Sequence, residues 1–288
     1  MIFRGVATAL ITPFTNGSID DKGFEKLLNY QLASGVDAVV VLGTTGEPAT
    51  MSQDEKKQVI SLAVKKLKGK IPVIVGAGSN STAAAIKSCE LAESLGADGL
   101  LVVTPYYNKC TQTGLIRHYS EIAAATDLPI ICYNVPSRTG VNMLPSTFSE
   151  LADIPNIVGI KEASGNMEQI MEYVRLSGDR AAVYSGDDSL TIPTMAMGGA
   201  GVISVVSNVC AEYVTTMTHA FDDGDLQKAS SKQRDMLPLV RAMFSEVNPI
   251  PVKYAAYLKG FCDGSLRLPL TPLSDGNAHT LKSLLEKF

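Results

Sequence analysis

The sequence predicts an α/β protein: a (β/α)8 TIM barrel with a C-terminal helical extension. Short apolar, β-branched runs alternate with helical patterns, which indicates βαβ units and parallel strand pairing. The number of runs, eight, is the strand number of this barrel. The expected strands are Gly5–Thr12, Asp37–Gly43, Ile71–Gly76, Gly99–Val103, Leu128–Asn134, Asn156–Lys161, Ala181–Gly186 and Gly201–Val206.

Helical patterns occupy the intervals between these runs. They are clearest over Ser52–Leu67, Thr82–Leu95, Thr113–Ala125 and Pro145–Ala152. Ser52 and Glu55 have the spacing of a capping box, in which each side chain accepts a backbone N–H at the start of a helix. The strand runs are apolar on both faces, as parallel strands covered by helices require.

Residues 1–223 are expected to form the barrel, and residues 224–288 the extension. Beyond residue 224 only helical patterns remain, over Asp225–Phe244, Pro251–Gly260 and Asp275–Phe288. The segment Asn248–Pro251 between the first two is too short and too apolar to be a flexible linker. The extension is therefore expected to pack on the barrel.

Composition favours small-molecule chemistry. The 288 residues carry a net charge of -4 and no basic stripe, which argues against nucleic acid and anionic membranes as partners. The five cysteines are scattered and never form a CxxC pair, so neither a disulfide framework nor a zinc site is indicated. With no recognisable targeting segment, a cytoplasmic location is expected.

Lys161 is the most informative residue, because it ends an otherwise apolar strand. Burial disfavours an ammonium, so the pKa of such an amine falls and the free amine becomes a nucleophile for Schiff-base chemistry. The alternative is a lysine that caps the strand and extends to solvent. Active sites of these barrels lie at the carboxyl ends of the strands, where Lys161 stands.

Other polar residues also follow strand ends. Tyr133 suits proton transfer beside an amine, although an isolated tyrosine is more often a core residue. Arg138, on the loop beyond, suits a substrate carboxylate, or else a surface salt bridge. The glycine-containing loop Gly43–Gly46 offers backbone N–H groups and threonine hydroxyls to a small carboxylate, or is an ordinary turn. The three histidines lie in helical patterns away from these ends, which disfavours metal and Ser-His-Asp chemistry.

Three segments, Gly43–Glu47, Tyr133–Gly140 and Gly159–Ala163, together resemble the dihydrodipicolinate synthase family. The resemblance spans the chain. It implies a homotetrameric lyase, a dimer of dimers, that condenses pyruvate with L-aspartate 4-semialdehyde in lysine and diaminopimelate biosynthesis. No metal or organic cofactor is implied, because the imine itself accepts the electrons.

The resemblance also implies a role for each matching residue. Lys161 would form the imine, and Tyr133 would relay protons. Thr44 would hydrogen-bond Tyr133, and Tyr107 of a neighbouring subunit would complete that relay. The remaining residues would bind substrate: Thr45 the pyruvate carboxylate, Arg138 the carboxylate of the semialdehyde, and Gly186 and Ile203 the pocket wall through main-chain groups.

One part of the family pattern is absent. Members inhibited by lysine use a serine, two histidines and a glutamate at an effector pocket. This chain has Pro48, Gln53, Lys56 and Ala84 at those positions, and keeps only Asn80 and Tyr106. Ala84 in place of an acid, with Lys56 nearby, disfavours a cationic ligand. Little or no lysine feedback is therefore expected.

Competing interpretations remain at this stage. A sister Schiff-base keto-acid aldolase, such as an N-acetylneuraminate lyase, would share Lys161 and Tyr133 but typically lacks an arginine in the Ser-Arg-Thr-Gly context of Arg138. A non-catalytic barrel would be expected to have lost its nucleophile. A phosphate- or flavin-binding barrel would need a glycine-rich loop after strand seven or eight, whereas Asp187 and Asp188 make that loop acidic.

Overall fold

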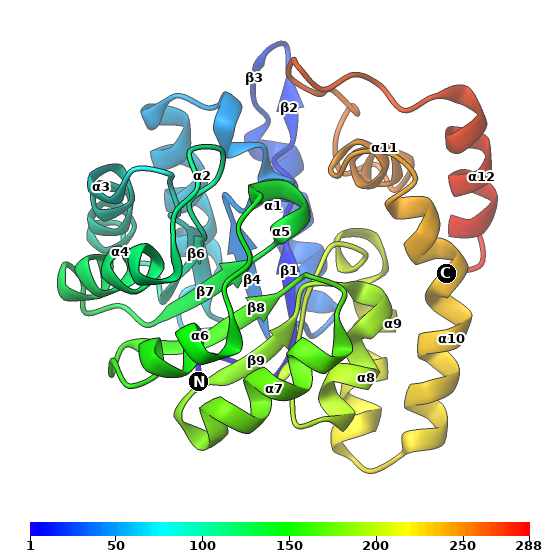
Figure 1. The fold of residues 1–288 in the computed structure, drawn as a ribbon. Coiled ribbons are helices and arrows are strands. Elements are labelled where there is room, and N and C mark those ends of the chain that lie inside the picture. Colours follow the sequence, from blue (N-terminus) through cyan, green and yellow to red (C-terminus); the bar gives the residue numbers. More distant parts are fainter.

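The computed structural model describes residues 1–288 and confirms the predicted barrel. Eight parallel strands close in the order β1-β10-β9-β8-β7-β6-β5-β4, as the centre of Figure 1 shows. The strands are β1 (Gly5–Ala9), β4 (Ala38–Val41), β5 (Val73–Gly76), β6 (Gly99–Val103), β7 (Ile130–Asn134), β8 (Ile157–Glu162), β9 (Ala182–Ser185) and β10 (Gly201–Ser204).

Most strands are shorter than the apolar runs that predicted them. The run Gly5–Thr12 continues past the end of β1 at Ala9, and Asp37–Gly43 continues past the end of β4 at Val41. Apolar character persists because these exits remain buried under loops and helices, so hydrophobicity alone does not mark the last paired residue. Strand β8 instead ends one residue later than its predicted run, at Glu162 rather than at Lys161.

Helices surround the barrel, as expected. Ser52 and Glu55 form the predicted capping box at the start of α2. The small hairpin of β2 (Phe14–Thr15) and β3 (Ser18–Ile19) was not expected, because two-residue strands carry almost no periodic signal. The helices are α1 (Asp21–Ala33), α2 (Gln53–Leu67), α3 (Thr82–Ser94), α4 (Gln112–Ala124), α5 (Pro136–Thr139), α6 (Pro145–Leu151), α7 (Met167–Ser177), α8 (Thr191–Ala196) and α9 (Ser207–Asp222).

Two apolar clusters make up the core. The larger one, of 66 buried residues, lies mainly between strands and helices, whereas 14 residues form a smaller cluster that includes Tyr133, Tyr184 and Ile203 from three barrel strands. The strands contribute to both clusters in alternation, as β7 does with Cys132 in the larger and Tyr133 in the smaller. Alternate residues of a strand therefore belong to the cluster under the helices and to the smaller cluster of strand residues.

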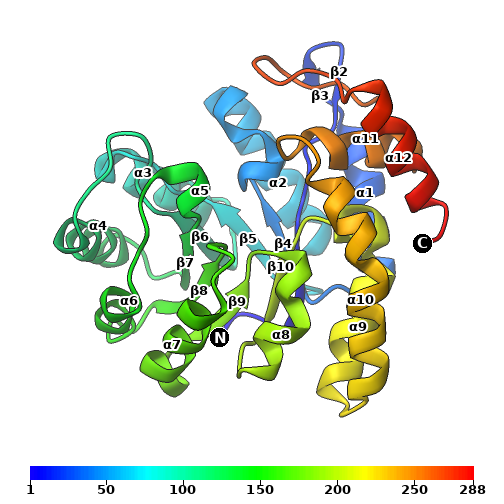
Figure 2. The ribbon, with the colours of Figure 1, turned by 45° about the vertical axis from the view of Figure 1, so that its right-hand side comes forward.

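Three helices follow the barrel: α10 (Leu226–Met243), α11 (Ile250–Leu258) and α12 (Asp275–Leu285). Figure 2 shows α10 running beside α9, while α12 packs against α10 and α11. The structure thus has C-terminal helices that contact the barrel's own helices. None of the helices combines the length and the apolar character needed to cross a lipid bilayer.

A buried ion pair joins these C-terminal helices to the loop after β4. Lys253 on α11 donates to Glu47 Oε1 at 2.5 Å, and both side chains are almost completely inaccessible. The Lys253 ammonium also lies 4.0 Å from the centre of the Phe14 ring. Burial lowers the pKa of Lys253, while Glu47 opposes that shift. Glu47 therefore holds the loop of Thr44 and Thr45 against α11.

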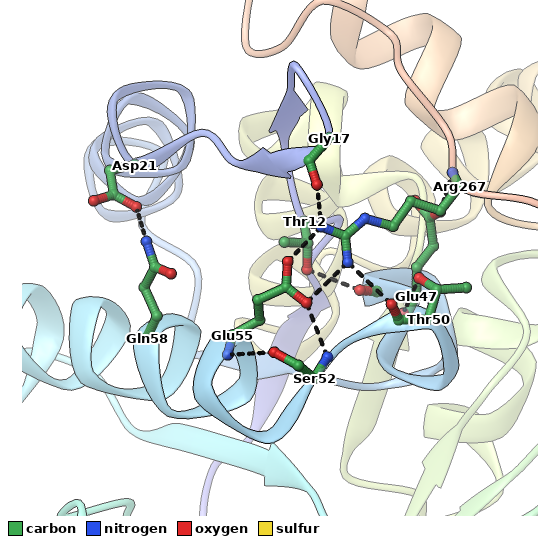
Figure 3. A network of polar contacts seen from close by, with 10 residues as sticks. Thr12, Gly17, Asp21, Glu47, Thr50, Ser52, Glu55, Gln58 and Arg267 are labelled. Carbon is green, nitrogen blue, oxygen red and sulfur yellow. Dashed lines mark hydrogen bonds and ion pairs between the residues drawn. The ribbon is translucent and has the colours of Figure 1, made fainter.

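Arg267 strengthens the same junction from the chain beyond α11 (Figure 3). Its backbone N–H donates to Glu47 Oε2 at 3.2 Å, and its guanidinium donates to the Thr50 carbonyl at 3.0 Å. It also pairs with Glu55, where the hydrogen bonds hold the pKa of that carboxyl at about 2. The loop and the start of α2 are thus fixed by one arginine.

We predict that Lys253→Met lowers the free energy of unfolding by about 3–5 kcal/mol, because Glu47 would remain buried without its cation. Denaturant unfolding followed by circular dichroism measures the change. Lys57→Met is the matched control, since Lys57 pairs with Asp54 at the surface, where such pairs contribute little. Equal, small losses in both variants would contradict the prediction, and the double variant Glu47→Gln/Lys253→Met should recover much of the loss.

Candidate active site

A cavity of about 460 Å³ lies at the carboxyl ends of the strands, where the sequence predicted the site. Its wall combines side chains from the loop after β4, the end of β7, the α5 segment and the chain between α10 and α11. The polar and charged residues that line it include Thr44, Lys56, Tyr106, Tyr133, Arg138 and Asn248. Three of the predicted site residues, Thr44, Tyr133 and Arg138, therefore line one cavity, whereas Lys161 and Thr45 are not among its lining residues.

Lys161 lies deep at this end of the barrel. Its side chain is buried, with 5% of the residue exposed, so the alternative of a lysine that reaches solvent is wrong. The parallel register of β7 and β8 pairs Lys161 with Tyr133, and the Lys161 Nζ lies 4.4 Å from the centre of the Tyr133 ring. Strand pairing thus places the amine and the phenol together.

Burial lowers the pKa of Lys161 to about 8. The carboxylates of Asp188 and Asp187 act in the opposite direction, because they favour the ammonium, whereas Arg138 adds to the lowering. About a tenth of the amine is therefore unprotonated at pH 7, far more than for a lysine in water. This is the state that can attack a carbonyl carbon.

Tyr133 is buried at the end of β7, and burial raises its pKa to about 12. The phenol is consequently protonated across the physiological range. Its hydroxyl forms no hydrogen bond within the chain, so the hydrogen bond expected from Thr44 is absent here, whereas the Tyr184 hydroxyl donates to the Phe3 carbonyl at 2.6 Å. A protonated, unpaired phenol beside an amine is suited to donate a proton to a reacting group.

The loop after β4 presents its two threonines differently. Thr44 is exposed and lines the cavity, whereas Thr45 is 3% exposed. The turn that carries them, η1 (Thr44–Gly46), is fixed because Thr12 Oγ1 donates to the Gly46 carbonyl at 2.8 Å. The turn is thus anchored on one side by Thr12 and on the other by the buried Glu47, and its role in binding a carboxylate stays a prediction.

Gly186 directly follows β9, the strand that pairs with the β8 strand of Lys161, and Ile203 lies on β10, one strand further round the barrel. A side chain on Gly186 would place its Cβ 3.1 Å from Lys161 Cε and 2.6 Å from the Ala163 Cβ, so only glycine leaves the lysine its space. Ile203, on β10, is fully buried in the smaller cluster together with Tyr133. Gly186 therefore adjoins the Lys161 side chain, whereas neither Gly186 nor Ile203 is among the residues that line the cavity.

Arg138 and Tyr107 lie further out. Arg138 is exposed on α5, and its Nη2 donates to the Asn248 carbonyl at 3.1 Å. It forms no salt bridge, so that alternative is wrong. Tyr107 is 89% exposed at a positive φ of 70° and does not line the cavity, so a single chain does not bring it to the other site residues.

Sequence reasoning missed two supporting carboxylates. Asp188 accepts from Ser204 Oγ at 2.5 Å and from the Val205 N–H at 3.0 Å, which fixes the exit of β10 near Lys161. Glu162 accepts from Asn134 Nδ2 at 2.8 Å and so ties β8 to β7 next to the Tyr133–Lys161 pair. The available signal was an acidic residue at or just beyond a buried strand end, since a buried charge requires partners.

The chain is similar to known proteins over its whole length. The dihydrodipicolinate synthetase family model matches residues 2–288. A 4-hydroxy-tetrahydrodipicolinate synthase from Thermoanaerobacter sp. (strain X514) is 49% identical, over 100% of this chain and 97% of the relative. The crystal structure of dihydrodipicolinate synthase from Thermotoga maritima is 48% identical with a TM-score of 0.98, covering 100% of this chain and 99% of that one. A structure described as the first monomeric dihydrodipicolinate synthase variant has the same identity and TM-score, covering 99% and 97%.

We predict that kcat/KM for pyruvate falls about tenfold per pH unit on the acid side of a midpoint near the Lys161 pKa of about 8. The ammonium, which predominates below that pKa, is not a nucleophile, and the value levels off above it. Steady-state kinetics from pH 6 to 9.5, taken as roughly the span of this titration, measure the profile.

Asp187→Asn is the matched variant for this profile. Asp187 raises the pKa of Lys161, so its neutralisation should move the acid limb to lower pH. A flat profile in the unmodified protein, or a limb that moves to higher pH in Asp187→Asn, would contradict the assignment of this limb to Lys161.

Proposed function

This chain belongs to the dihydrodipicolinate synthetase family, and we propose that it condenses pyruvate with L-aspartate 4-semialdehyde through a Schiff base on Lys161. It is a pyruvate-dependent lyase with the 4-hydroxy-tetrahydrodipicolinate synthase function, in lysine and diaminopimelate biosynthesis. The observation that carries the chemical proposal is the buried Lys161 amine, paired by strand register with the protonated phenol of Tyr133.

The proposed first half-reaction joins pyruvate to the enzyme. The neutral Lys161 amine attacks the ketone carbon, and loss of the carbonyl oxygen as water leaves an imine. Tyr133 supplies the proton that this departure requires, through a relay in which Thr44 and Tyr107 take part. Thr45 holds the pyruvate carboxylate, while Gly186 and Ile203 line the pocket through main-chain groups.

The second half-reaction forms the new carbon–carbon bond. A proton leaves the methyl carbon of the imine, giving an enamine whose carbon attacks the aldehyde of the semialdehyde. The electron pair of the broken C–H bond is delocalised onto the imine nitrogen and then forms the new carbon–carbon bond, so no metal or organic cofactor is required. Arg138 at the mouth binds the carboxylate of the second substrate, which keeps its aldehyde directed at the enamine. The amino group that the semialdehyde brought with it then attacks the imine carbon, and cleavage of the bond between that carbon and Nζ releases Lys161 as the free amine.

The proposal includes an assembly and a location. Tyr107 is exposed in one chain, and its part in the relay requires a neighbouring copy, in keeping with a homotetramer built as a dimer of dimers. A cytoplasmic location is in keeping with five free thiols. We also retain the division into a barrel, residues 1–223, and a helical extension, residues 224–288.

The alternatives receive no support. Lys161, Tyr133, Thr44 and Arg138 are all present and lie at one end of the barrel, which is not the condition of a barrel that has lost its nucleophile. The similar proteins named above are called dihydrodipicolinate synthase or 4-hydroxy-tetrahydrodipicolinate synthase, and none is called an N-acetylneuraminate lyase.

Purified protein is expected to consume pyruvate with L-aspartate 4-semialdehyde and not with N-acetylmannosamine. Arg138→Ala should retain borohydride-trapped pyruvate on the enzyme but lose on the order of 10²-fold or more in kcat/KM for the semialdehyde, since a charged hydrogen-bonded contact is removed. A coupled spectrophotometric assay and intact-mass analysis give the two readouts. Turnover only with the amino sugar, or loss of pyruvate capture in Arg138→Ala, would contradict the assignment.

Lysine is expected to leave the activity nearly unchanged. Pro48, Gln53 and Lys56 line the cavity wall, and the Lys56 ammonium would repel a cationic effector. Initial rates at saturating and half-saturating pyruvate, titrated with L-lysine, test the expectation. Half-inhibition below roughly millimolar lysine, an affinity worth some 4 kcal/mol, would show that the altered pocket still binds the effector.

A further inference from the structure

Asn248 connects the two residues that bind the substrate carboxylates in the proposed function. It lies between α10 and α11, is 6% exposed and lines the cavity. Its Nδ2 donates to Thr45 Oγ1 at 3.0 Å, and its main-chain carbonyl accepts from Arg138 Nη2 at 3.1 Å. One residue of the C-terminal helical region thus contacts both carboxylate-binding side chains.

The direction of the first hydrogen bond matters. A threonine hydroxyl has a single proton, and it can donate that proton to a substrate only if its other partner donates to it. Thr45 accepts from Asn248, so its proton is left for the pyruvate carboxylate. With the amide reversed, the Asn248 carbonyl oxygen would take the Thr45 proton, and the loop would lose a donor.

The remaining end of the amide is unusual. Asn248 Oδ1 is buried and has no hydrogen-bond partner within the chain. A buried acceptor without a partner is costly, and most such atoms in folded proteins are paired. Packing alone would be served better by an apolar side chain of similar size, so the amide is retained here for what its Nδ2 does.

We propose that Asn248 is a positioning residue, which orients the Thr45 hydroxyl as a donor to the pyruvate carboxylate. The inference rests on the proposed role of Thr45. The Arg138 contact uses the main chain of Asn248 and therefore survives any change of its side chain. A side-chain substitution should consequently affect pyruvate and spare the semialdehyde.

Asn248→Ala is expected to raise the pyruvate KM about three- to tenfold, as loss of one neutral hydrogen bond does, with kcat and the semialdehyde KM within about twofold. Asn248→Asp is nearly isosteric but reverses the bond, since its carboxylate accepts the Thr45 proton and repels pyruvate. It should therefore weaken pyruvate binding more than alanine does. Circular dichroism and thermal unfolding establish that each variant folds.

A Thr45→Val background provides the decisive comparison. With no hydroxyl to orient, Asn248→Ala should have no further effect on the pyruvate KM, so the two substitutions should be strongly non-additive. The inference would be overturned by additive effects, by an Asn248→Asp variant milder than Asn248→Ala, or by equal losses for both substrates. In each of these cases, normal turnover by the wild-type protein would leave the proposed function intact. Wild-type protein that captures no pyruvate would overturn both.

Discussion

The burial of a single amine is the constraint on which the rest of the site depends. Lys161 can act as a nucleophile because the barrel removes it from water, yet burial of a cation opposes folding unless the amine is neutral or compensated. Asp187 and Asp188 supply part of that compensation, and Ser204 with the following backbone holds Asp188 in turn. The pKa of about 8 is the balance between these opposing effects.

The proposed chemistry also requires that the groups around the amine be held in place. Several of the contacts that hold them come from residues C-terminal to the barrel. The loop of Thr44 and Thr45 is held by Glu47, whose partners are Lys253 and the backbone of Arg267. Asn248 reaches Thr45 from the same part of the chain. The C-terminal helices therefore belong to the active site physically, since they fix the loop on which pyruvate recognition is proposed to depend.

Much of this arrangement follows from the sequence. Alternating strand and helix patterns predicted the barrel, and the rule that strand ends meet at one mouth brought Lys161 and Tyr133 together before any contact was known. Local patterns could not supply Asn248 or Lys253, because their partners lie about two hundred positions away in sequence. Periodicity reports which face is buried and carries no information about such long-range polar pairs. Tyr107 is a further limit, since its proposed partner residues lie in another copy.

The most direct test of the account is the identity of the lysine that captures pyruvate. The protein is mixed with pyruvate, reduced with borohydride, digested and mapped by mass spectrometry, with a sample lacking pyruvate and the Lys161→Ala variant in parallel. The account predicts one pyruvyl adduct, on the peptide containing Lys161, and none in the variant. An adduct on another lysine, or capture that persists in Lys161→Ala, would contradict the central claim that the buried amine of β8 is the nucleophile.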